Sequence, residues 1–147
     1  MHLTIRTSLA MRTLMFCAAN PGRIVRRAEI AEACGASENH LAQVIYLLAQ
    51  HGFLHTIRGR AGGLTLARAP ETISVGEVFR QFEKVLPFSD CIGHENPKCP
   101  LAGACRLTCV LSSALEQFYE TLDRSMISDL VGGNLALEER LQLPIAC

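Results

Sequence analysis

Three cysteines in one irregular segment are the residues best suited to chemistry in this chain of 147 residues. The segment CIGHENPKCPLAGACRL contains Cys91, Cys99 and Cys105, which are separated by seven and five residues. Its prolines and glycines disfavour an ordinary helix or strand. Thiolates that converge suit soft or borderline metals, namely zinc or an iron–sulfur cluster. The spacing matches neither paired CxxC zinc motifs nor a ferredoxin, so it predicts a metal site without identifying the metal.

Candidates for a fourth ligand lie close to these cysteines in the sequence. His94 would complete a Cys3His zinc site, and Cys109 follows Cys105 by one helical turn, although we expect Cys109 to be a core residue. Cys17 and Cys34 occupy apolar helical positions and are predicted to be small core residues. The odd number of cysteines, seven, disfavours a disulfide framework.

The charges of the chain cancel overall but divide it into two halves. Up to residue 70 there are eight arginines and three glutamates, a balance of +5, and the remaining residues carry −5. A basic half is typical of proteins that bind a polyanion, with uneven solvated charge as the plainer alternative. No apolar run reaches the roughly 20 residues of a membrane span, and Arg6 and Arg12 interrupt the first apolar stretch, unlike a secretory signal. We expect one compact domain with an appendage, in the cytoplasm and without a membrane partner.

The basic half has the pattern of a helix-turn-helix. Residues 4–19 show helical spacing of apolar residues and end at an Asn-Pro-Gly sequence, and a short helix in RRAEIAEACGAS is closed by Gly35. Ser37 is predicted to cap a third helix, whose apolar residues recur at helical spacing: Leu41, Val44, Ile45 and Leu48. Two short helices joined by a glycine turn predict a helix-turn-helix.

The other face of the third helix carries polar side chains that suit DNA bases. Asn and Gln amides pair bidentately with adenine, and a helix fits the major groove. After Gly52, the sequence FLHTIRGRAGGLTLAR predicts two short strands around an arginine-bearing loop, a wing suited to phosphates or a narrow minor groove. A solvated polar face and an ordinary hairpin are the alternatives, but the combination favours duplex DNA. The predicted DNA-binding residues are Ser37, Asn39, His40, Gln43, Tyr46, Arg58 and Arg60.

The acidic half predicts two further helices. ISVGEVFRQFEKV has apolar residues at the spacing of one buried face, and a longer helix of about 30 Å follows the cysteines. Its apolar stripe consists of Leu107, Leu111, Ala114, Leu115, Phe118 and Leu122. The stripe serves either as a dimer seam or for packing within the chain. Helix-turn-helix proteins usually bind DNA as dimers, which favours the seam.

These elements predict a mainly α fold with a small β wing. We divide the chain into a winged helix-turn-helix region at 1–85, a cluster-binding loop at 86–105, and a dimerisation helix with a C-terminal tail at 106–147. An enzyme is disfavoured because GxSxG, Walker, HExxH and paired-carboxylate motifs are all absent from the sequence.

The sequence resembles the Rrf2 superfamily of winged-helix repressors, and in particular its nitric-oxide-sensing NsrR-type members. The resemblance covers nearly the whole chain and rests on MHLT, SENHLAQVI, RGRAGGLTLA, ISVGEVFR, CPLAGACRL and LDRSMISDLV. It implies a homodimeric repressor that binds operator DNA, with the three cysteines holding an iron–sulfur cluster, usually 4Fe-4S, with 2Fe-2S as the alternative. Reaction of the cluster with nitric oxide would then relieve repression.

One departure from the family pattern concerns Ser8. Many NsrR-type sequences have an aspartate near this position, which the partner subunit donates as fourth ligand, so Ser8 joins His94 and Cys109 as a candidate. The same cysteine spacing occurs in the iron-responsive RirA-like repressors, which makes iron the second candidate signal. A zinc-stabilised or thiol-redox regulator is the third alternative.

Overall fold

Helix α1 (Ile5–Ala19) lies at the centre of the folded body in the computed structural model, which describes residues 3–83, 99–101 and 104–142. Thr4 caps it, and the Thr4 hydroxyl accepts a hydrogen bond of 3.2 Å from the Thr7 N–H group. Buried side chains such as Leu9, Leu14 and Phe16 recur along its length. Helices α2, α3, α4, α6 and α7 and strand β2 all pack against α1, so its position affects most of the body.

The helix-turn-helix is formed by α2 (Arg27–Cys34) and α3 (Glu38–Gln50), as the sequence predicted. Gly35 ends α2 with a φ of 59°, which L side chains rarely adopt, and the Ala36 N–H group donates to the Ala31 carbonyl at 2.9 Å. The apolar residues predicted for the inner face of α3 are all buried: Leu41, Val44, Ile45 and Leu48. The position of α3 is therefore fixed by packing into the core.

The wing is an antiparallel hairpin of β1 (Leu54–Ile57) and β2 (Gly63–Leu66), with Leu54 opposite Leu66 and Ile57 opposite Gly63. Val25 adds an isolated bridge on the far side of β2, exchanging backbone hydrogen bonds of 2.9 and 2.7 Å with Leu64. This bridge joins the wing to the segment that precedes α2. A short 3-10 helix, η1 (Pro70–Thr72), then leads into α4 (Val75–Phe82).

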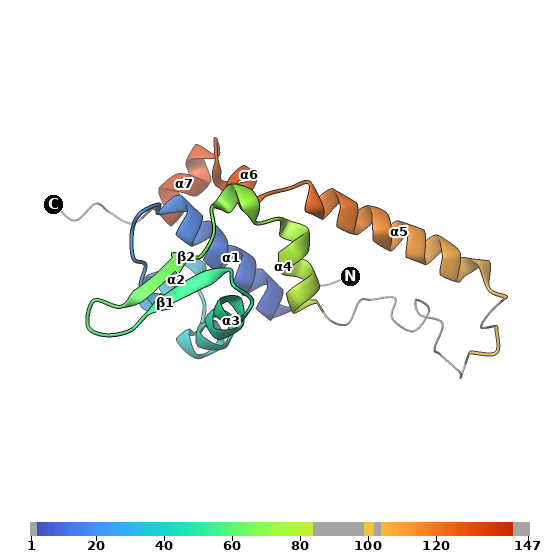
Figure 1. The fold of residues 1–147 in the computed structure, drawn as a ribbon, viewed down its shortest axis with the longest axis horizontal. Helices are drawn as coiled ribbons and strands as arrows, with labels where there is room; N and C mark the ends of the chain where they lie inside the picture. Colours follow the sequence, from blue (N-terminus) through green and yellow to red (C-terminus); the bar gives the residue numbers. More distant parts are fainter. Residues whose placement is uncertain (1–2, 84–98, 102–103, 143–147) are drawn as a thin grey trace.

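Helix α5 (Arg106–Asp123) projects away from the body, as Figure 1 shows. Its 18 residues give it a length of about 27 Å. After it, α6 (Ile127–Val131) and α7 (Leu135–Leu141) return to α1. The buried Asn20 amide group donates to the carbonyls of Phe16 and Leu141, both at 2.8 Å. Mainly helical with a small two-stranded sheet, the fold confirms the predicted class.

The three-part division of the chain remains a prediction, but the structure adds one fact to it. Ile127, Val131 and Leu141, which we assigned to the segment at 106–147, are buried in the core cluster that contains α1. Residues 127–141 are therefore part of the same body as the helix-turn-helix.

Candidate DNA-binding surface and cysteine site

The outer face of α3 presents the polar side chains singled out from the sequence. Asn39, His40, Gln43 and Tyr46 are all exposed, and Tyr46 has an exposed fraction of 67%. Because the opposite face is buried in the core, these side chains lie on the side of α3 that is open to a ligand. The geometry is that of a recognition helix whose backbone is held while its amides remain available.

The start of α3 is held to α2 by an ion pair. Ser37 is the N-cap residue, as predicted, but its side chain makes no capping hydrogen bond. Instead, the Arg27 Nε donates to the Glu38 carboxylate at 3.0 Å, which connects the first turns of the two helices. Both side chains are about half exposed, so this contact contributes at most about 1 kcal/mol and core packing remains the main constraint on α3.

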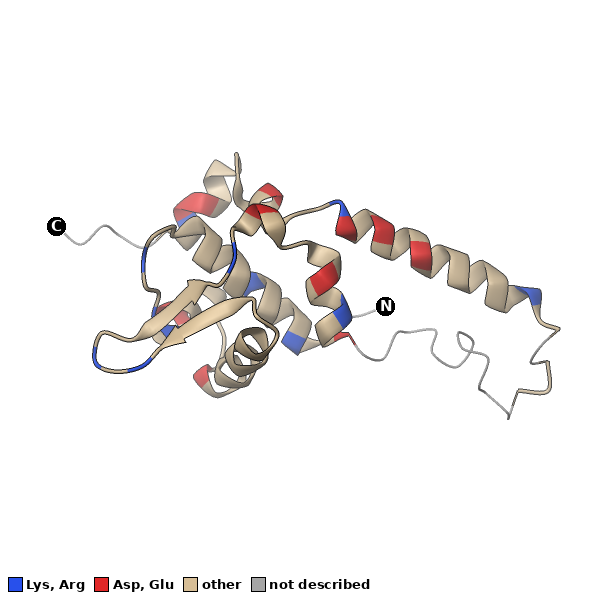
Figure 2. Cartoon of the chain, in the orientation of Figure 1, with Lys and Arg blue, Asp and Glu red and all other residues tan. Residues whose placement is uncertain are grey.

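The wing carries its arginines in the loop between the two strands, where Figure 2 colours the end of the hairpin blue for basic residues. Gly59 has a φ of 105°, and a Cβ at Gly62 would lie 2.3 Å from the Ile57 carbonyl oxygen, so the loop requires glycine at both positions. Arg58 and Arg60 are exposed, and neither forms an ion pair within the described residues. Their guanidinium groups are available to an anionic ligand.

Two of the three predicted cluster ligands lie in the described part of the chain. Cys99 is exposed, and Cys105 is half-buried at the N-cap of α5. Cys91 and His94 lie outside the described residues. Within the described ranges no three metal-binding side chains gather, so the full ligand set is not brought together there. The donors that are described fit a cluster, because both thiols are reachable and a helix N-terminus favours negative charge.

The remaining cysteines differ in accessibility. Burial raises the pKa of Cys17 to about 12, and it also raises the pKa of Cys34, against a smaller lowering by Arg12. Both thiols pack in or against the core, as predicted, and their raised pKa values disfavour the thiolate form that binds metals. The expectation of a core position for Cys109 is wrong within the single chain. Its side chain is exposed, and no other element among the described residues covers this part of α5.

Ser8 lies half-buried in α1, beside a hydrogen-bond network that the sequence analysis did not predict. The Glu83 Oε1 atom accepts from the Thr4 N–H group at 2.8 Å and from the Thr7 hydroxyl at 2.6 Å. Glu83 is also the residue that ends α4, through a backbone hydrogen bond to Phe79. The carboxylate therefore joins the end of α4 to the first turn of α1.

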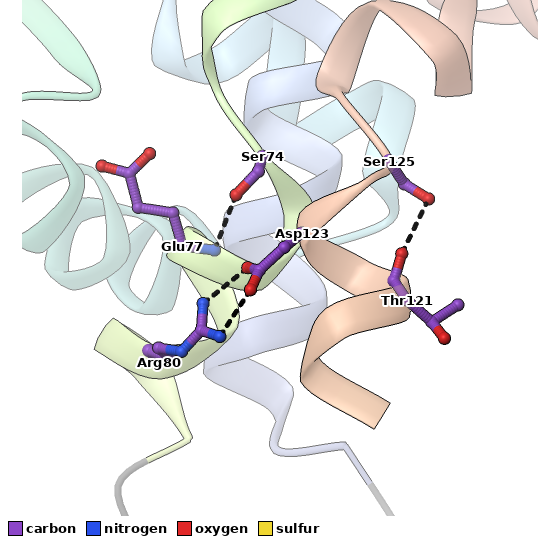
Figure 3. A network of polar contacts seen from close by, with 6 residues as sticks. All are labelled: Ser74, Glu77, Arg80, Thr121, Asp123 and Ser125. Atoms are coloured by element: carbon purple, nitrogen blue, oxygen red, sulfur yellow. Dashed lines mark hydrogen bonds and ion pairs between the residues drawn. The ribbon is translucent and has the colours of Figure 1, made fainter. Parts of the chain in front are cut away.

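A second unpredicted network joins α4 to α5, and Figure 3 shows it from close by. The Arg80 guanidinium donates to both carboxylate oxygens of Asp123, at 2.6 and 2.7 Å, and these hydrogen bonds lower the pKa of Asp123. Arg80 also lies 4.5 Å from the centre of the Tyr119 ring, which places a cation over an aromatic face. Two backbone hydrogen bonds close to this pair, from Val75 to Ser125 and from Ile127 to Ile73, hold the end of α5 against the start of α4.

Gly76 permits this close contact between the helices. A Cβ at Gly76 would lie 2.0 Å from the Asp123 Oδ1 atom and 3.0 Å from its backbone nitrogen. The only sequence signal for the contact was a glycine inside ISVGEVFR, at a position where a helix ordinarily disfavours glycine. We define Gly76, Arg80, Tyr119 and Asp123 as the α4–α5 junction.

Among the described residues, only the C-terminal end of α5 is packed on the body. Phe118 lies with its ring centre 6.3 Å from that of Phe79, whereas Leu107 and Val110 are 54% and 63% exposed. The N-terminal half of the helix, which begins beside Cys105, therefore presents apolar side chains that nothing in the described chain covers. Within the described ranges, no helix is long and apolar enough to cross a membrane.

A helix-turn-helix with an adjoining β wing defines the winged-helix class of DNA-binding proteins. The family model "Rrf2: Iron-dependent Transcriptional regulator" matches residues 3–133. The chain belongs to the Rrf2 family of transcriptional regulators and is not an enzyme.

Individual relatives agree with this assignment. Bacillus licheniformis has a relative named HTH-type transcriptional regulator NsrR that is 39% identical over 132 residues, covering 89% of this chain and 92% of the relative. The regulator of the same name from Bacillus subtilis is 40% identical over 132 residues, covering 89% and 90%. Among solved structures, T. potens IscR superposes with a TM-score of 0.69 at 25% identity, covering 99% of this chain and 94% of that one.

Proposed function

We propose that the chain is a homodimeric transcriptional repressor that binds operator DNA and senses nitric oxide through an iron–sulfur cluster. In this proposal α3 enters the major groove and the wing contacts the backbone or the minor groove. Cys91, Cys99 and Cys105 hold the cluster, most simply of the 4Fe-4S type. Operator affinity is high while the cluster is intact and falls when it is modified. A regulator of this kind acts in the cytoplasm, where bacterial operators lie.

The exposed amides on the outer face of α3 are the observation that carries the DNA-binding part. Asn39 and Gln43 lie one helical turn apart, and their helix is fixed through its buried face. Side chains so placed can reach successive base edges without loss of core packing. Arg58 and Arg60 provide positive charge on the wing.

The uncovered N-terminal half of α5 supports the homodimer. Exposed apolar side chains on a projecting helix are costly in water, and a second copy of α5 offers a matching apolar surface. Because Cys105 is the N-cap residue of this helix, dimer contacts would also fix one end of the cysteine segment.

Nitric oxide is the signal favoured by the relatives, since those that are 39% and 40% identical over most of the chain are named NsrR. A bound cluster would supply iron that reacts with nitric oxide, and Cys91, Cys99 and Cys105 would supply its thiolate ligands. Iron availability is the second candidate signal. One specific observation favours it, because the matching family model is described as an iron-dependent regulator.

An anaerobic absorption spectrum, with iron and sulfide analysis, tests the cofactor. We expect brown protein with iron and sulfide in equal amounts, and operator binding that weakens on addition of stoichiometric nitric oxide more than on mild chelation. Release of DNA by a chelator, with no response to nitric oxide, would favour the iron-responsive function. Colourless protein with one zinc ion per chain would reject both.

Substitutions on α3 and the wing test the DNA-binding part. Gln43→Ala should cost about 1–3 kcal/mol on the operator and little on random duplex, because the amide reads a base. Arg60→Ala should weaken binding to both the operator and random duplex, because a phosphate contact is independent of sequence. It should also lower the slope of log affinity against log salt by about one. Measure both variants by fluorescence anisotropy across a salt titration. Equal losses on the two duplexes for Gln43→Ala would reject base reading by α3.

A further inference from the structure

One carboxylate lies at the edge of the proposed DNA-reading surface. Glu38 is the first residue of α3 and directly precedes Asn39, and both side chains are exposed. The Glu38 Oε2 atom accepts a hydrogen bond of 3.0 Å from the Nε atom of Arg27, in the first turn of α2. The contact therefore joins the starts of the two helices of the helix-turn-helix. We call Arg27 and Glu38 the α2–α3 ion pair.

The fold depends little on the charge of Glu38. Each side chain of the pair is 51% exposed, so water and salt screen their attraction. Within the described residues, the Glu38 side chain contacts Arg27 alone. Glu29 of α2 differs, because it accepts from the Arg26 N–H group at 2.6 Å and so caps its own helix. The main effect of Glu38 is therefore on the charge of the surface beside Asn39.

Arg27 has unused hydrogen-bond donors. A guanidinium group has N–H donors on all three nitrogens, and Arg27 uses only its Nε atom for Glu38. Its terminal nitrogens make no hydrogen bond within the described residues. When the second helix of a helix-turn-helix lies in the major groove, the first helix crosses the DNA backbone. Arg27 lies on that first helix, against the start of α3, so its free nitrogens can contact a phosphate group when α3 docks.

The carboxylate of Glu38 weakens such a contact. A lone guanidinium attracts the DNA polyanion and releases counterions when it neutralises a phosphate. The α2–α3 ion pair has no net charge, and Glu38 repels the phosphates that Arg27 attracts. Arg58 and Arg60 on the wing have no ion-pair partner within the described residues. The wing arginines therefore contribute their full charge to DNA binding, whereas Arg27 contributes only part of its charge.

We infer that Arg27 contacts the DNA backbone and that Glu38 limits the strength of this contact. Glu38 thereby lowers the affinity of the chain for duplex DNA in general, without changing which sequence it prefers. Base reading by Asn39 and Gln43 is separate from this effect, because their amides carry no charge. The inference rests on the proposed function, since it assumes that α3 docks in the major groove. It adds a phosphate contact to the surface, together with the residue that opposes it.

Salt titrations of the full chain with operator and random duplex, followed by fluorescence anisotropy, test the inference. One unopposed phosphate contact steepens the slope of log affinity against log salt by about 0.9, which corresponds to about fivefold in affinity at about 0.15 M salt. Glu38→Gln keeps an acceptor oxygen for Arg27 but removes the charge. It should tighten binding to both duplexes about fivefold and steepen the slope by about one. If Glu38 served only to hold α3 in place, the same variant would bind more weakly.

The double variant Arg27→Ala/Glu38→Gln identifies the residue that makes the contact. It removes the proposed phosphate contact together with the charge that opposes it. Affinity and slope should therefore return to about their wild-type values, on both duplexes.

Glu32→Gln is the matched control for net charge. Glu32 is exposed on α2 and forms no ion pair within the described residues, so its replacement changes the total charge equally without freeing Arg27. It should leave the slope nearly unchanged. The inference is overturned if Glu32→Gln tightens binding as much as Glu38→Gln, if Glu38→Gln tightens binding to neither duplex or to the operator alone, or if the double variant keeps the gain. A wild-type chain that binds neither duplex would instead refute the proposed function, and the inference with it.

Discussion

Gly76→Ala should destabilise the chain, although the same change inside a helix ordinarily stabilises a protein. An alanine in place of glycine gains about 1 kcal/mol from helix propensity. At this position the new Cβ would lie 2.0 Å from the Asp123 Oδ1 atom and 3.0 Å from its backbone nitrogen. The carboxylate cannot turn aside without losing its hydrogen bonds to Arg80, and the backbone nitrogen cannot move without shifting α5. We therefore take the upper end of overpacking costs, about 3 kcal/mol.

The overpacking cost exceeds the gain in helix propensity, so the free energy of unfolding should fall by about 2 kcal/mol. For a domain of this size, that corresponds to a fall in Tm of about 4–8 °C. Thermal unfolding of the metal-free chain, followed by circular dichroism, measures it. The matched control is the pair Asp123→Ala and Gly76→Ala/Asp123→Ala, because removal of the carboxylate relieves the closest contact. In that background the glycine substitution should cost much less. A higher Tm for Gly76→Ala alone would show that the helices are not as close as described.

The remaining predictions concern the cluster and the junction. Ser8→Ala should leave the cluster spectrum nearly unchanged, and Ser8→Asp should slow cluster loss to a chelator, because a carboxylate is a better ligand for iron than a hydroxyl; anaerobic loss rates of the two variants measure this. Cys105→Ala should abolish iron binding and Cys34→Ala should not, as iron analysis of the purified proteins will test. The pKa of Asp123 is lowered in the folded state, so its contribution to stability is present above the ordinary pKa of 3.8 and is lost as the pH falls through the lower native pKa. The free energies of unfolding of wild type and Asp123→Asn, measured with urea, should therefore converge in acid.

The helices of the body and the wing were predictable because their signals are local. Gly35 ends one helix, Asn20 and Pro21 follow another, and the buried face of α3 repeats with helical spacing. Such signals act between residues that are close in the sequence, so the elements they predict do not depend on the tertiary contacts. The exposure of Asn39 and Gln43 follows from the same periodicity, since they lie opposite the buried residues.

The contacts that join elements were not predictable in the same way. Glu83 reaches Thr4 and Thr7 across more than seventy residues, and Arg80 reaches Asp123 across 43. No spacing rule connects such pairs, because they depend on how whole helices pack. Cys109 was misjudged for a related reason. We expected Cys109 to be a core residue from its helical position, but no element among the described residues covers the N-terminal half of α5.

The return of α6 and α7 to α1 also determines when the body can form during synthesis. Ile127, Val131 and Leu141 complete the core around α1, so a nascent chain that has emerged only as far as α4 lacks part of that core. The most distant of these contacts spans 121 residues, between Asn20 and Leu141, and contacts of such sequence separation form late in folding. Cys91, Cys99 and Cys105, which we propose as cluster ligands, all precede residue 127, so they leave the ribosome while α1 is still incompletely covered. If these thiols hold the proposed cluster, the order of the chain allows metal to reach them before the DNA-binding body has closed.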